Sequence, residues 1–375
     1  MATIEERKNK SGSTWKITWY HKGVRQRPIT VPSEERAIEW KRLIELHKGD
    51  QQKAARDYAI AKSKSPKLSV VAQSHMDRLR SEKFTIQSYQ GYMRNHITPK
   101  LGDYPVAEIS EDDVRRLIAK LEEDLKPKTV HNIAGFLGSV LSHAVKRGDI
   151  AASPYHHSML PDAEELDERE DDKFMTSDEV HKIIAAVKQP WAADAFRFLL
   201  ATGLRPAELR ALLVKDIHLS GKQPVVRVTK AIKRDRVDGD YVGPPKTKTS
   251  RRSVGLPPSV VTMITKYTDG RGADEPLFEA PKGGRLGREI LRYWWEKGRG
   301  QTDVLRKPSV YALRHTHASL MLATGMDIWK LSRHLGHSNP VITSRVYAHL
   351  MPEAHYQAAQ LAETFTAPAE LTGSV

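Results

Sequence analysis

The chain opens with alternating hydrophobic and polar positions. Trp15, Ile17 and Trp19 alternate with polar neighbours, which predicts a strand with one buried face. A second extended run covers residues 25–31. Ser33 then begins a predicted helix, since serine is a preferred N-cap residue.

That helix has an apolar side made by Ala37, Trp40 and Ile44. We therefore expect residues 1–64 to form a small three-stranded sheet with one helix. Residues 47–67 are polar and end in a Ser, Lys and Pro stretch, which is typical of a linker.

The pattern becomes helical from Leu68 to about His156. Ser110 is a predicted helix N-cap. Hydrophobic residues recur at helical spacing in two long segments, Val114, Leu117, Ile118 and Leu121 in the first, and Val130, Ile133, Leu137, Val140 and Leu141 in the second. This periodicity predicts a bundle of four or five helices over residues 65–160.

A strongly acidic segment, residues 161–172, contains a single Arg and cannot bury itself. We expect it to be a solvated connector between two domains. Thr176 and Glu179 then form the capping box of a new helix.

The remaining chain mixes helices with a predicted strand pair, residues 225–231 and 250–256. Residues 173–375 are therefore expected to form a mainly α domain with a small β-sheet. The predicted fold class is α+β and multidomain, with a small N-terminal sheet and helix, an all-α bundle, and this last domain.

The charge of the chain is strongly basic. There are 60 Lys and Arg against 46 Asp and Glu, a formal net charge of +14. This balance favours a polyanionic partner, nucleic acid above all. In the first 30 residues basic side chains far outnumber acidic ones, and Lys16, Lys22, Arg25 and Arg27 are candidate DNA contacts. A hairpin edge protected by solvated cations is the alternative.

The sequence contains no cysteine, which excludes disulfides, thiolate metal sites and a thiol nucleophile. The N-terminal residues lack the apolar core of a secretory signal, and no stretch reaches the roughly 18 apolar residues of a membrane span. We expect no membrane partner and a cytoplasmic location.

The first candidate for chemistry is the segment ATGLRPAELRAL at residues 201–212. Gly203 ends one predicted helix and Pro206 begins another, so Arg205 lies at a helix N-terminus. A guanidinium there can grip two phosphate oxygens, and Glu208 can hold it in place. An ordinary Arg–Glu pair on a helix face is the alternative.

Three further segments lie close together in the sequence: YALRHTHASL at 311–320, LSRHLGHSNP at 331–340 and VITSRVYAHL at 341–350. Gly325 and Gly336 are predicted helix C-caps. The loops between the helices can therefore converge on one cleft.

In these motifs the chain resembles the tyrosine recombinase family, in particular phage integrases with an extra N-terminal DNA-binding domain. TGLRPAEL resembles the first arginine box of the family and ALRHT the second, which implies that Arg205 and Arg314 are catalytic. LGH implies His337, and RVYAHL implies Tyr347 as the nucleophile.

The hairpin lysine of the family is matched best by Lys246 in PPKTKTSRRSVGL, although Lys248 also fits. One position departs from the family: Tyr311 stands where a His is usual, three residues before Arg314. His315 occupies a different place in the box. A tyrosine hydroxyl can hydrogen-bond a phosphate oxygen, but it is a poorer general base than imidazole at neutral pH.

The resemblance also implies a role for each predicted domain. Residues 1–64 would bind arm-type DNA sites, and residues 65–160 would be a core-binding domain of the SAM-like type. Residues 161–172 would link these to a catalytic domain at 173–375.

The implied reaction integrates and excises phage or mobile-element DNA through a 3′-phosphotyrosine, without a metal, ATP or another cofactor. The implied partners are double-stranded DNA with core and arm-type attachment sites, three further copies of the chain in a tetramer, a host factor that bends DNA, and an excision factor. The location would be the nucleoid of a bacterial host. Residues 353–363 would dock on a neighbouring protomer, with local packing as the alternative.

Two other classes of function remain open at this stage. The first is a metal-dependent nuclease, whose ligands would come from His315, His317, His334, His337 and His349. Their spacing is not typical of a metal site, and few carboxylates lie near them in the sequence. The second is a DNA-binding regulator that keeps the fold without catalysis, for which Tyr311 is the best argument.

Overall fold

The computed structural model describes most of the chain, and its described residues form two compact units, Met1–Asp167 and Glu168–Val375. The segments outside the described residues are 10–11, 161–173, 222, 246, 340 and 342–375. The acidic connector predicted at 161–172 falls there.

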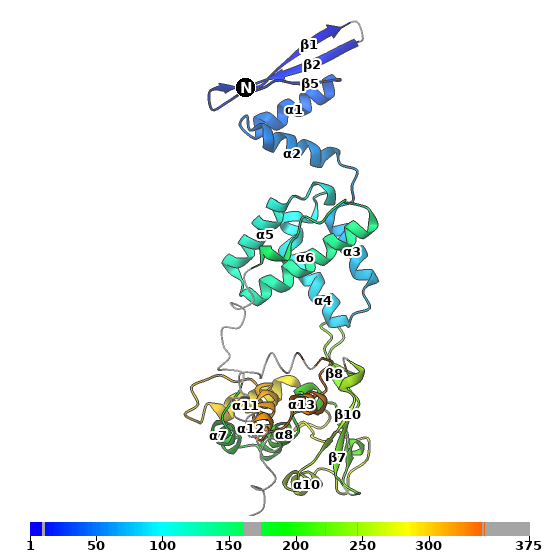
Figure 1. Cartoon of the computed structure of the whole chain (residues 1–375), viewed down its shortest axis with the longest axis vertical. Helices are drawn as coiled ribbons and strands as arrows, with labels where there is room; N and C mark the ends of the chain where they lie inside the picture. The colour runs from blue at the N-terminus through cyan, green and yellow to red at the C-terminus, as the bar shows by residue number, and fades with distance from the viewer. Residues whose placement is uncertain (10–11, 161–173, 222, 246, 340, 342–375) are drawn as a thin grey trace, which may run out of the picture. The chain divides into compact units, whose positions relative to one another are not determined.

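The N-terminal part of the first unit is a three-stranded antiparallel sheet in the order β1-β2-β5 (Figure 1). The strands are β1 (Thr3–Asn9), β2 (Gly12–Thr18) and β5 (Ile29–Val31). Helix α1 (Glu34–Leu46) begins after Ser33, whose hydroxyl accepts the Arg36 N–H, and it packs against this sheet. The alternating pattern has the expected effect, since Ile17 and Trp19 are buried with Ala37 and Ile44 of the helix.

The extended run predicted at 25–31 is not one strand. Val24–Arg25 is β4, which pairs with β3 (Tyr20–His21) in a separate two-stranded sheet. Only Ile29–Val31 joins the larger sheet. Pro28 lies between the two pieces, and proline has no N–H to donate to a continuous ladder.

The linker predicted at 47–67 is wrong, because Gln51–Lys62 forms helix α2. Asp50 caps this helix by accepting the Lys53 N–H at 3.2 Å. Ala54 is fully buried, and the ring of Tyr58 stacks on Trp40 with centroids 4.9 Å apart. These few contacts suffice to order a segment whose composition is mostly polar.

The second part of this unit is the predicted all-α bundle. Its helices are α3 (Leu68–Arg78), α4 (Lys83–Tyr92) continuing into η1 (Met93–Gly102), η2 (Val106–Glu108), α5 (Glu111–Asp124), α6 (Pro127–Arg147) and η3 (His157–Met159). Ser110 and Asp113 form the capping box of α5. The hydrophobic positions predicted for α5 and α6 are buried in one core with those of α3 and η1.

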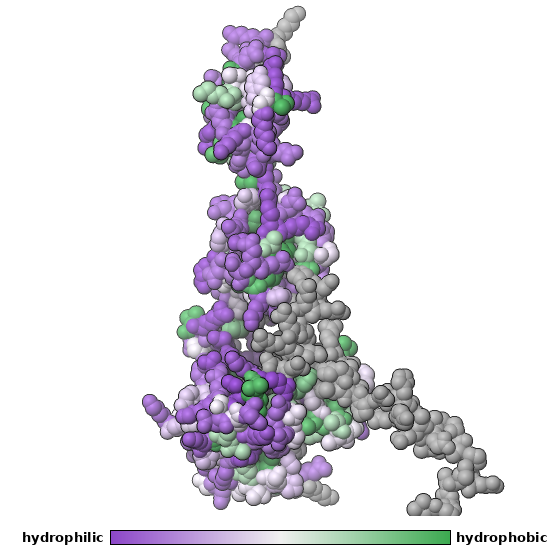
Figure 2. Space-filling model, turned by 90° about the vertical axis from the view of Figure 1, so that its left-hand side faces the viewer, coloured by the Kyte–Doolittle hydropathy of each residue, from purple (hydrophilic) through white to green (hydrophobic). Residues whose placement is uncertain are grey.

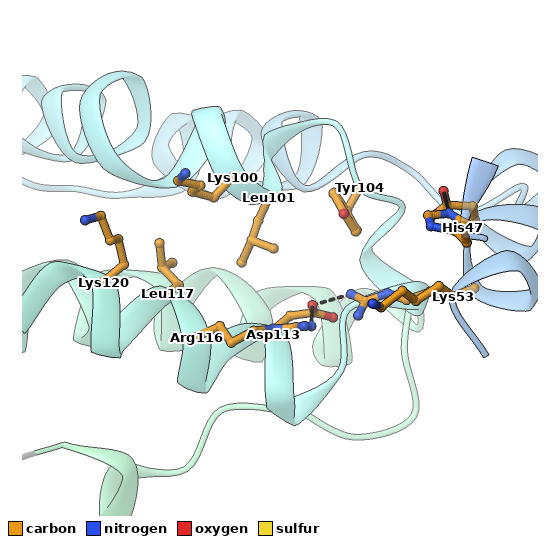
Figure 3. A pocket seen from close by; sticks show the side chains of 11 residues that line it. His47, Lys53, Lys100, Leu101, Tyr104, Asp113, Arg116, Leu117 and Lys120 are labelled. Carbon is orange, nitrogen blue, oxygen red and sulfur yellow. Dashed lines mark hydrogen bonds and ion pairs between the residues drawn. The ribbon is translucent and has the colours of Figure 1, made fainter. Parts of the chain in front are cut away.

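A cavity of about 410 Å³ lies between α2, η1 and α5 (Figure 3). Its walls carry the basic side chains of Lys53, Arg56, Lys100, Arg116 and Lys120. Arg56 of α2 forms an ion pair with Asp113 of α5, which Arg116 also contacts at 2.6 Å. Burial alone would raise the pKa of Asp113, but hydrogen bonds from Arg56, Ser110 and Arg116 outweigh it and lower the pKa to about 2.

The second unit is mainly helical with a small sheet, as predicted (Figure 1). Its helices are α7 (Ser177–Ala186), α8 (Pro190–Thr202), α9 (Pro206–Leu209), η6 (Val214–Asp216), η7 (Lys248–Ser250), α10 (Pro258–Thr265), α11 (Arg288–Arg299), α12 (Ala312–Ala323) and α13 (Ile328–Leu335). The capping box of Thr176 and Glu179 begins α7 as expected.

The predicted strand pair is also present, as β7 (Val225–Val228) and β10 (Arg252–Gly255). The full sheet order is β10-β7-β6, where β6 is Ile217–His218. A separate hairpin is made by β8 (Ala231–Lys233) and β9 (Tyr241–Gly243). One core cluster joins the sheet to α7, α8 and α11, and a smaller one joins α12 to α13.

The face shown in Figure 2 is largely hydrophilic over the described residues, with hydrophobic side chains in scattered spots. Among the helices in the described part of the chain, none has the length and apolar character needed to cross a bilayer.

Candidate active site

Arg205 lies where the chain passes from α8 to α9. Helix α8 ends at Thr202 and is capped by Gly203, whose φ of +62° is in the left-handed region that favours glycine. Arg205 is the N-cap of α9, and its guanidinium donates to Glu208 at 2.8 Å. Because α9 has only four residues, the charge at this point comes from the guanidinium rather than from a helix dipole.

Glu208 is a buried carboxylate shared by two arginines. The expected contact with Arg205 is present, and Arg252 of β10 donates to the same carboxylate at 2.9 and 3.2 Å. Burial alone would raise the pKa of Glu208, but the hydrogen bond and charge of Arg252 and the charge of Arg205 lower it. Glu208 is therefore ionised and fixes both guanidinium groups.

Arg314 of α12 is almost completely buried, with 1% of its surface exposed. Its guanidinium donates to the carbonyl oxygens of Gly203 and Leu335, both at 2.6 Å. Burial and the nearby charge of Arg205 lower the pKa of Arg314, but guanidinium groups remain charged in proteins. One cation thus joins the end of α8 to the end of α13.

His337 follows α13 at the turn made by Gly336, whose φ is +70°. Burial and the charges of Arg314, Arg205 and Arg252 lower the pKa of His337 to about 4. The imidazole is therefore neutral at pH 7. Its electrostatic coupling to all three arginines places it in the same cluster.

Tyr311 lies at the start of α12 and is 41% exposed. Its ring is 5.1 Å from that of His315, in an edge-on arrangement. It acts electrostatically on Arg314, and His315 acts on His337. Tyr311, which the resemblance places where a His is usual, thus lies beside the arginine cluster.

Two predicted site residues, Lys246 and Tyr347, lie outside the described residues, and the side chain of Lys248 is also not described. The segment that follows Lys246 is described. Thr247 bonds Ser250 at 2.9 Å, and the Ser250 hydroxyl donates to the Gly336 carbonyl at 3.3 Å. The segment just before β10 therefore lies against the turn that carries His337.

The four candidate DNA contacts of the N-terminal part do not lie on one sheet. Lys16 is in β2, on the face opposite Ile17, whereas Arg25 is in β4 of the two-stranded sheet. Lys22 is in the β3–β4 turn with a φ of +49°, and Arg27 lies between β4 and β5. Lys22, Arg25 and Arg27 are exposed.

Sequence reasoning missed Arg252, and it considered His317 and His334 only as possible metal ligands. Arg252 is two residues before buried Val254, so strand alternation would have placed it on the inner face of β10. His317 and His334 meet through their Nε2 atoms at 2.9 Å, a contact between two helices that no local pattern announces. In the described part of the chain, no three His, Asp or Glu side chains gather as metal ligands would.

Three guanidinium groups around one carboxylate leave a surplus of positive charge that is held rigidly before any ligand binds. Such preorganised donors bind phosphate oxygens and stabilise the charge that develops on them during phosphoryl transfer. The fold and the site therefore define an enzyme that acts on a phosphodiester.

Comparisons with known proteins narrow this class. The model of the phage integrase central domain matches residues 68–158, and that of the phage integrase family matches residues 173–354. The chain belongs to the phage integrase family and is a site-specific tyrosine recombinase.

Several known proteins are similar to this chain. A XerC-like tyrosine recombinase of Caldanaerobacter subterraneus is 27% identical over 304 residues, covering 74% of this chain and 76% of that protein. The integrase of Mycobacterium phage D29 is 27% identical over 262 residues, covering 67% of this chain and 66% of that protein.

Solved structures share the fold. The integrase of the Tn1549 transposon, in complex with a circular intermediate DNA, superposes with a TM-score of 0.68 at 21% identity, covering 80% of this chain and 99% of that one. A lambda integrase tetramer bound to a Holliday junction gives a TM-score of 0.60 at 15% identity, covering 88% and 92%.

Proposed function

We propose that Tyr347 is the nucleophile of this recombinase and that Arg205, Arg314 and His337 bind the phosphate it attacks. The observation that carries the proposal is the fixed geometry of the two arginines. Each is held by buried acceptors, the Glu208 carboxylate for Arg205 and two backbone carbonyls for Arg314.

The reaction follows from these residue types. The phenolic oxygen of Tyr347 loses its proton to solvent water and bonds to phosphorus while the bond from phosphorus to the 5′ oxygen breaks. Lys246 gives its proton to this departing 5′ oxygen, which leaves as a 5′-hydroxyl, with Lys248 as the alternative donor. The result is a 3′-phosphotyrosine, which conserves the bond energy so that the 5′-hydroxyl of another strand can reverse the step.

Charge on the phosphate is the main difficulty of this chemistry, and the arginine cluster addresses it. Removing Arg205 or Arg314 should lower the cleavage rate about a hundredfold or more, roughly 3 kcal/mol of transition-state stabilisation. Neutral His337 donates one N–H to the same phosphate. Tyr311 donates its hydroxyl hydrogen to another phosphate oxygen in place of the usual His of the family.

The decisive test traps the covalent intermediate. Sequencing the junctions of a recombination product first reveals the crossover sequence. A nicked duplex of that sequence, incubated with the protein, should give a protein–DNA adduct on a denaturing gel, and EDTA should not reduce it.

Tyr347→Phe should give no adduct, whereas Tyr356→Phe, a change at another tyrosine near the same end of the sequence, should leave the yield unchanged. Strand breakage without an adduct would contradict the phosphotyrosine route. Binding without either breakage or an adduct would favour the regulator that lacks catalysis.

The proposed roles of the domains are arm-site binding for residues 1–64, core-site binding for 65–160, connection for 161–172 and catalysis for 173–375. Lys16, Lys22, Arg25 and Arg27 contact the arm DNA in this assignment, and their basic charge supports it. Deletion of residues 1–64 should leave cleavage of the nicked core duplex intact and abolish integration. Normal integration by the truncated protein would refute the assignment.

We further propose that four copies of the chain act together on DNA, since the related lambda integrase forms a tetramer on a Holliday junction. The helix expected at 353–363 would join neighbouring protomers, but it lies outside the described residues. A host DNA-bending factor, an excision factor and a place at the bacterial nucleoid complete the proposal. Pull-down of the protein from host cells in which excision has been induced, followed by mass spectrometry, tests for both factors.

A further inference from the structure

Behind the arginine cluster lies a pair of histidines from two helices, one buried and one half-buried. His317 of α12 is 2% exposed, and its Nε2 atom is 2.9 Å from Nε2 of His334 in α13. The two rings are nearly parallel, with an interplanar angle of 18°. His317 also contacts the Leu200 carbonyl of α8 through Nδ1 at 2.7 Å.

The Leu200 carbonyl fixes the direction of these hydrogen bonds. A carbonyl oxygen only accepts, so Nδ1 of His317 carries the proton and Nε2 of the neutral ring has a free lone pair. The proton between the two Nε2 atoms must then come from His334. The ring of His334 also has the Thr202 backbone as a partner, so both imidazoles are tied to α8.

The histidine pair joins the same three helices that Arg314 joins. His317 is three residues after Arg314 in α12, so the two side chains lie on one face of that helix. Arg314 bonds Gly203 and Leu335, and the pair bonds Leu200 and includes His334. The carbonyls that hold the guanidinium thus belong to chain segments that the histidines clamp together.

Close packing reinforces this clamp. A Cβ atom on Gly203 would lie 2.5 Å from Cδ2 of His317, so the imidazole lies directly against the backbone whose carbonyl accepts from Arg314. On the other side, Arg252 donates its Nε proton to the His334 carbonyl at 2.7 Å. The pair therefore lies between the backbone of Gly203, which holds Arg314, and the side chain of Arg252.

We propose that His317 and His334 are positioning residues that hold the Arg314 guanidinium in place for DNA strand cleavage. They act through the ends of α8 and α13 and do not touch the DNA. The role rests on the proposed function for its kinetic consequence, but the placement of Arg314 can be measured without any reaction.

The charged groups that face the pair are Arg314 from α12 and Arg252 from β10. Burial and the neighbouring His334 lower the pKa of His317 to about 4, and burial with these arginines lowers the pKa of His334. Hydrogen bonds to the Leu200 and Thr202 backbone of α8 act in the opposite direction. The lowered pKa of each imidazole favours the uncharged ring near neutral pH.

The first experiment measures single-turnover cleavage of the nicked core duplex by the full chain. His317→Leu removes both ring hydrogen bonds and should slow adduct formation about tenfold or more, because small displacements of a catalytic group are costly. The dissociation constant for the DNA should stay within about twofold. His317→Asn can keep the bond to Leu200 and should recover part of the rate.

A purely structural role would give a different result. Partial unfolding lowers the final yield of adduct but leaves the rate constant of the folded molecules unchanged. His181→Leu, an exposed histidine on α7, is the matched control and should change neither quantity. A normal rate constant for His317→Leu would overturn the proposal.

A double-mutant cycle tests the route through Arg314. In an Arg314→Lys background the placement of the guanidinium no longer matters, so adding His317→Leu should change the rate less than about twofold. An undiminished tenfold effect in that background would show that the pair acts elsewhere and would refute the proposal.

The last measurement separates this proposal from the recombinase mechanism. Guanidinium NMR signals of Arg314, assigned by their loss in Arg314→Lys, should show restricted rotation in the wild type and free rotation in His317→Leu. Unchanged signals would overturn the positioning role. If the signals change but the wild type forms no adduct, the proposed function fails while the positioning role stands.

Discussion

Glu208 is a negative side chain enclosed by positive ones, and its removal is a strong test at the scale of single residues. Glu208→Ala leaves Arg205 and Arg252 without their shared carboxylate, and breaking a buried ion pair in this way costs roughly 3 to 5 kcal/mol. We expect urea denaturation to show this decrease in the free energy of unfolding. Glu289→Ala, at an exposed Arg292 pair on α11, should change it by less than about 0.5 kcal/mol.

Two histidines with a lowered pKa make stability depend on pH. The pKa of both His317 and His337 is about 4 in the folded protein, against about 6.5 in an unfolded chain. Between these values the unfolded state binds more protons, so the free energy of unfolding falls as the pH is lowered from 6.5 to 4.

For the well-buried His317 this loss amounts to about 3 kcal/mol. Thermal unfolding across this pH range measures the effect, and His317→Leu should show a weaker dependence than the wild type. An equal slope in the two proteins would contradict the assigned titration.

Sequence motifs located Arg205, Arg314 and His337, because each lies in a short local pattern at a helix boundary. The supporting residues were not found in this way. Arg252 and His334 reach the site only when β10 and α13 pack beside α9 and α12, and such contacts depend on tertiary structure.

At the scale of elements, the link between α2 and α5 gives a second pH test. The pKa of Asp113 is about 2 in the folded protein, against about 3.9 in an unfolded chain. Its ion pairs therefore contribute their full stabilisation above about pH 3.9, and this stabilisation is lost as the pH falls towards 2. We expect Asp113→Ala to cost roughly 1 to 2 kcal/mol at pH 7 after allowance for solvent screening, and much less at pH 2.5.

Arg115→Ala is a suitable control on the same helix, since Arg115 makes an exposed pair with Glu111. Urea denaturation, monitored by a spectroscopic probe located in the first unit, would measure the free energy of unfolding of both variants. A loss for Asp113→Ala that is the same at both pH values would count against the ion pair.

The elements that sequence alone predicts are those with strong periodicity and caps. Helices α5, α6 and α7 have clear apolar faces, and the capping boxes at Ser110 and Thr176 mark two of their starts. Helix α2 escaped notice because its buried side is little more than Ala54 and Tyr58. Its order depends on Trp40 and Asp113, which belong to other elements.

At the scale of the whole molecule, the net charge of +14 predicts salt-sensitive DNA binding. Each phosphate that is neutralised releases counterions, so a protein with six or more such contacts loses about a thousandfold in affinity between 50 and 200 mM salt. Fluorescence anisotropy on random-sequence duplex should show this loss.

Deletion of residues 1–64 should reduce the slope of affinity against salt, because basic side chains are concentrated in the first 30 residues. An unchanged slope would mean that this region does not contact the DNA backbone. The truncated protein is compared with the full chain in which the four candidate contacts, Lys16, Lys22, Arg25 and Arg27, are changed to Ser.

The partners of Arg314 have an evolutionary consequence. Both are main-chain oxygens, which every amino acid supplies, so no exchange of side chain at 203 or 335 deletes an acceptor. Substitutions at these two positions can therefore displace the buried cation only by changing the path of the backbone. Insertions and deletions change that path directly, so selection at this spot should act against changes in chain length.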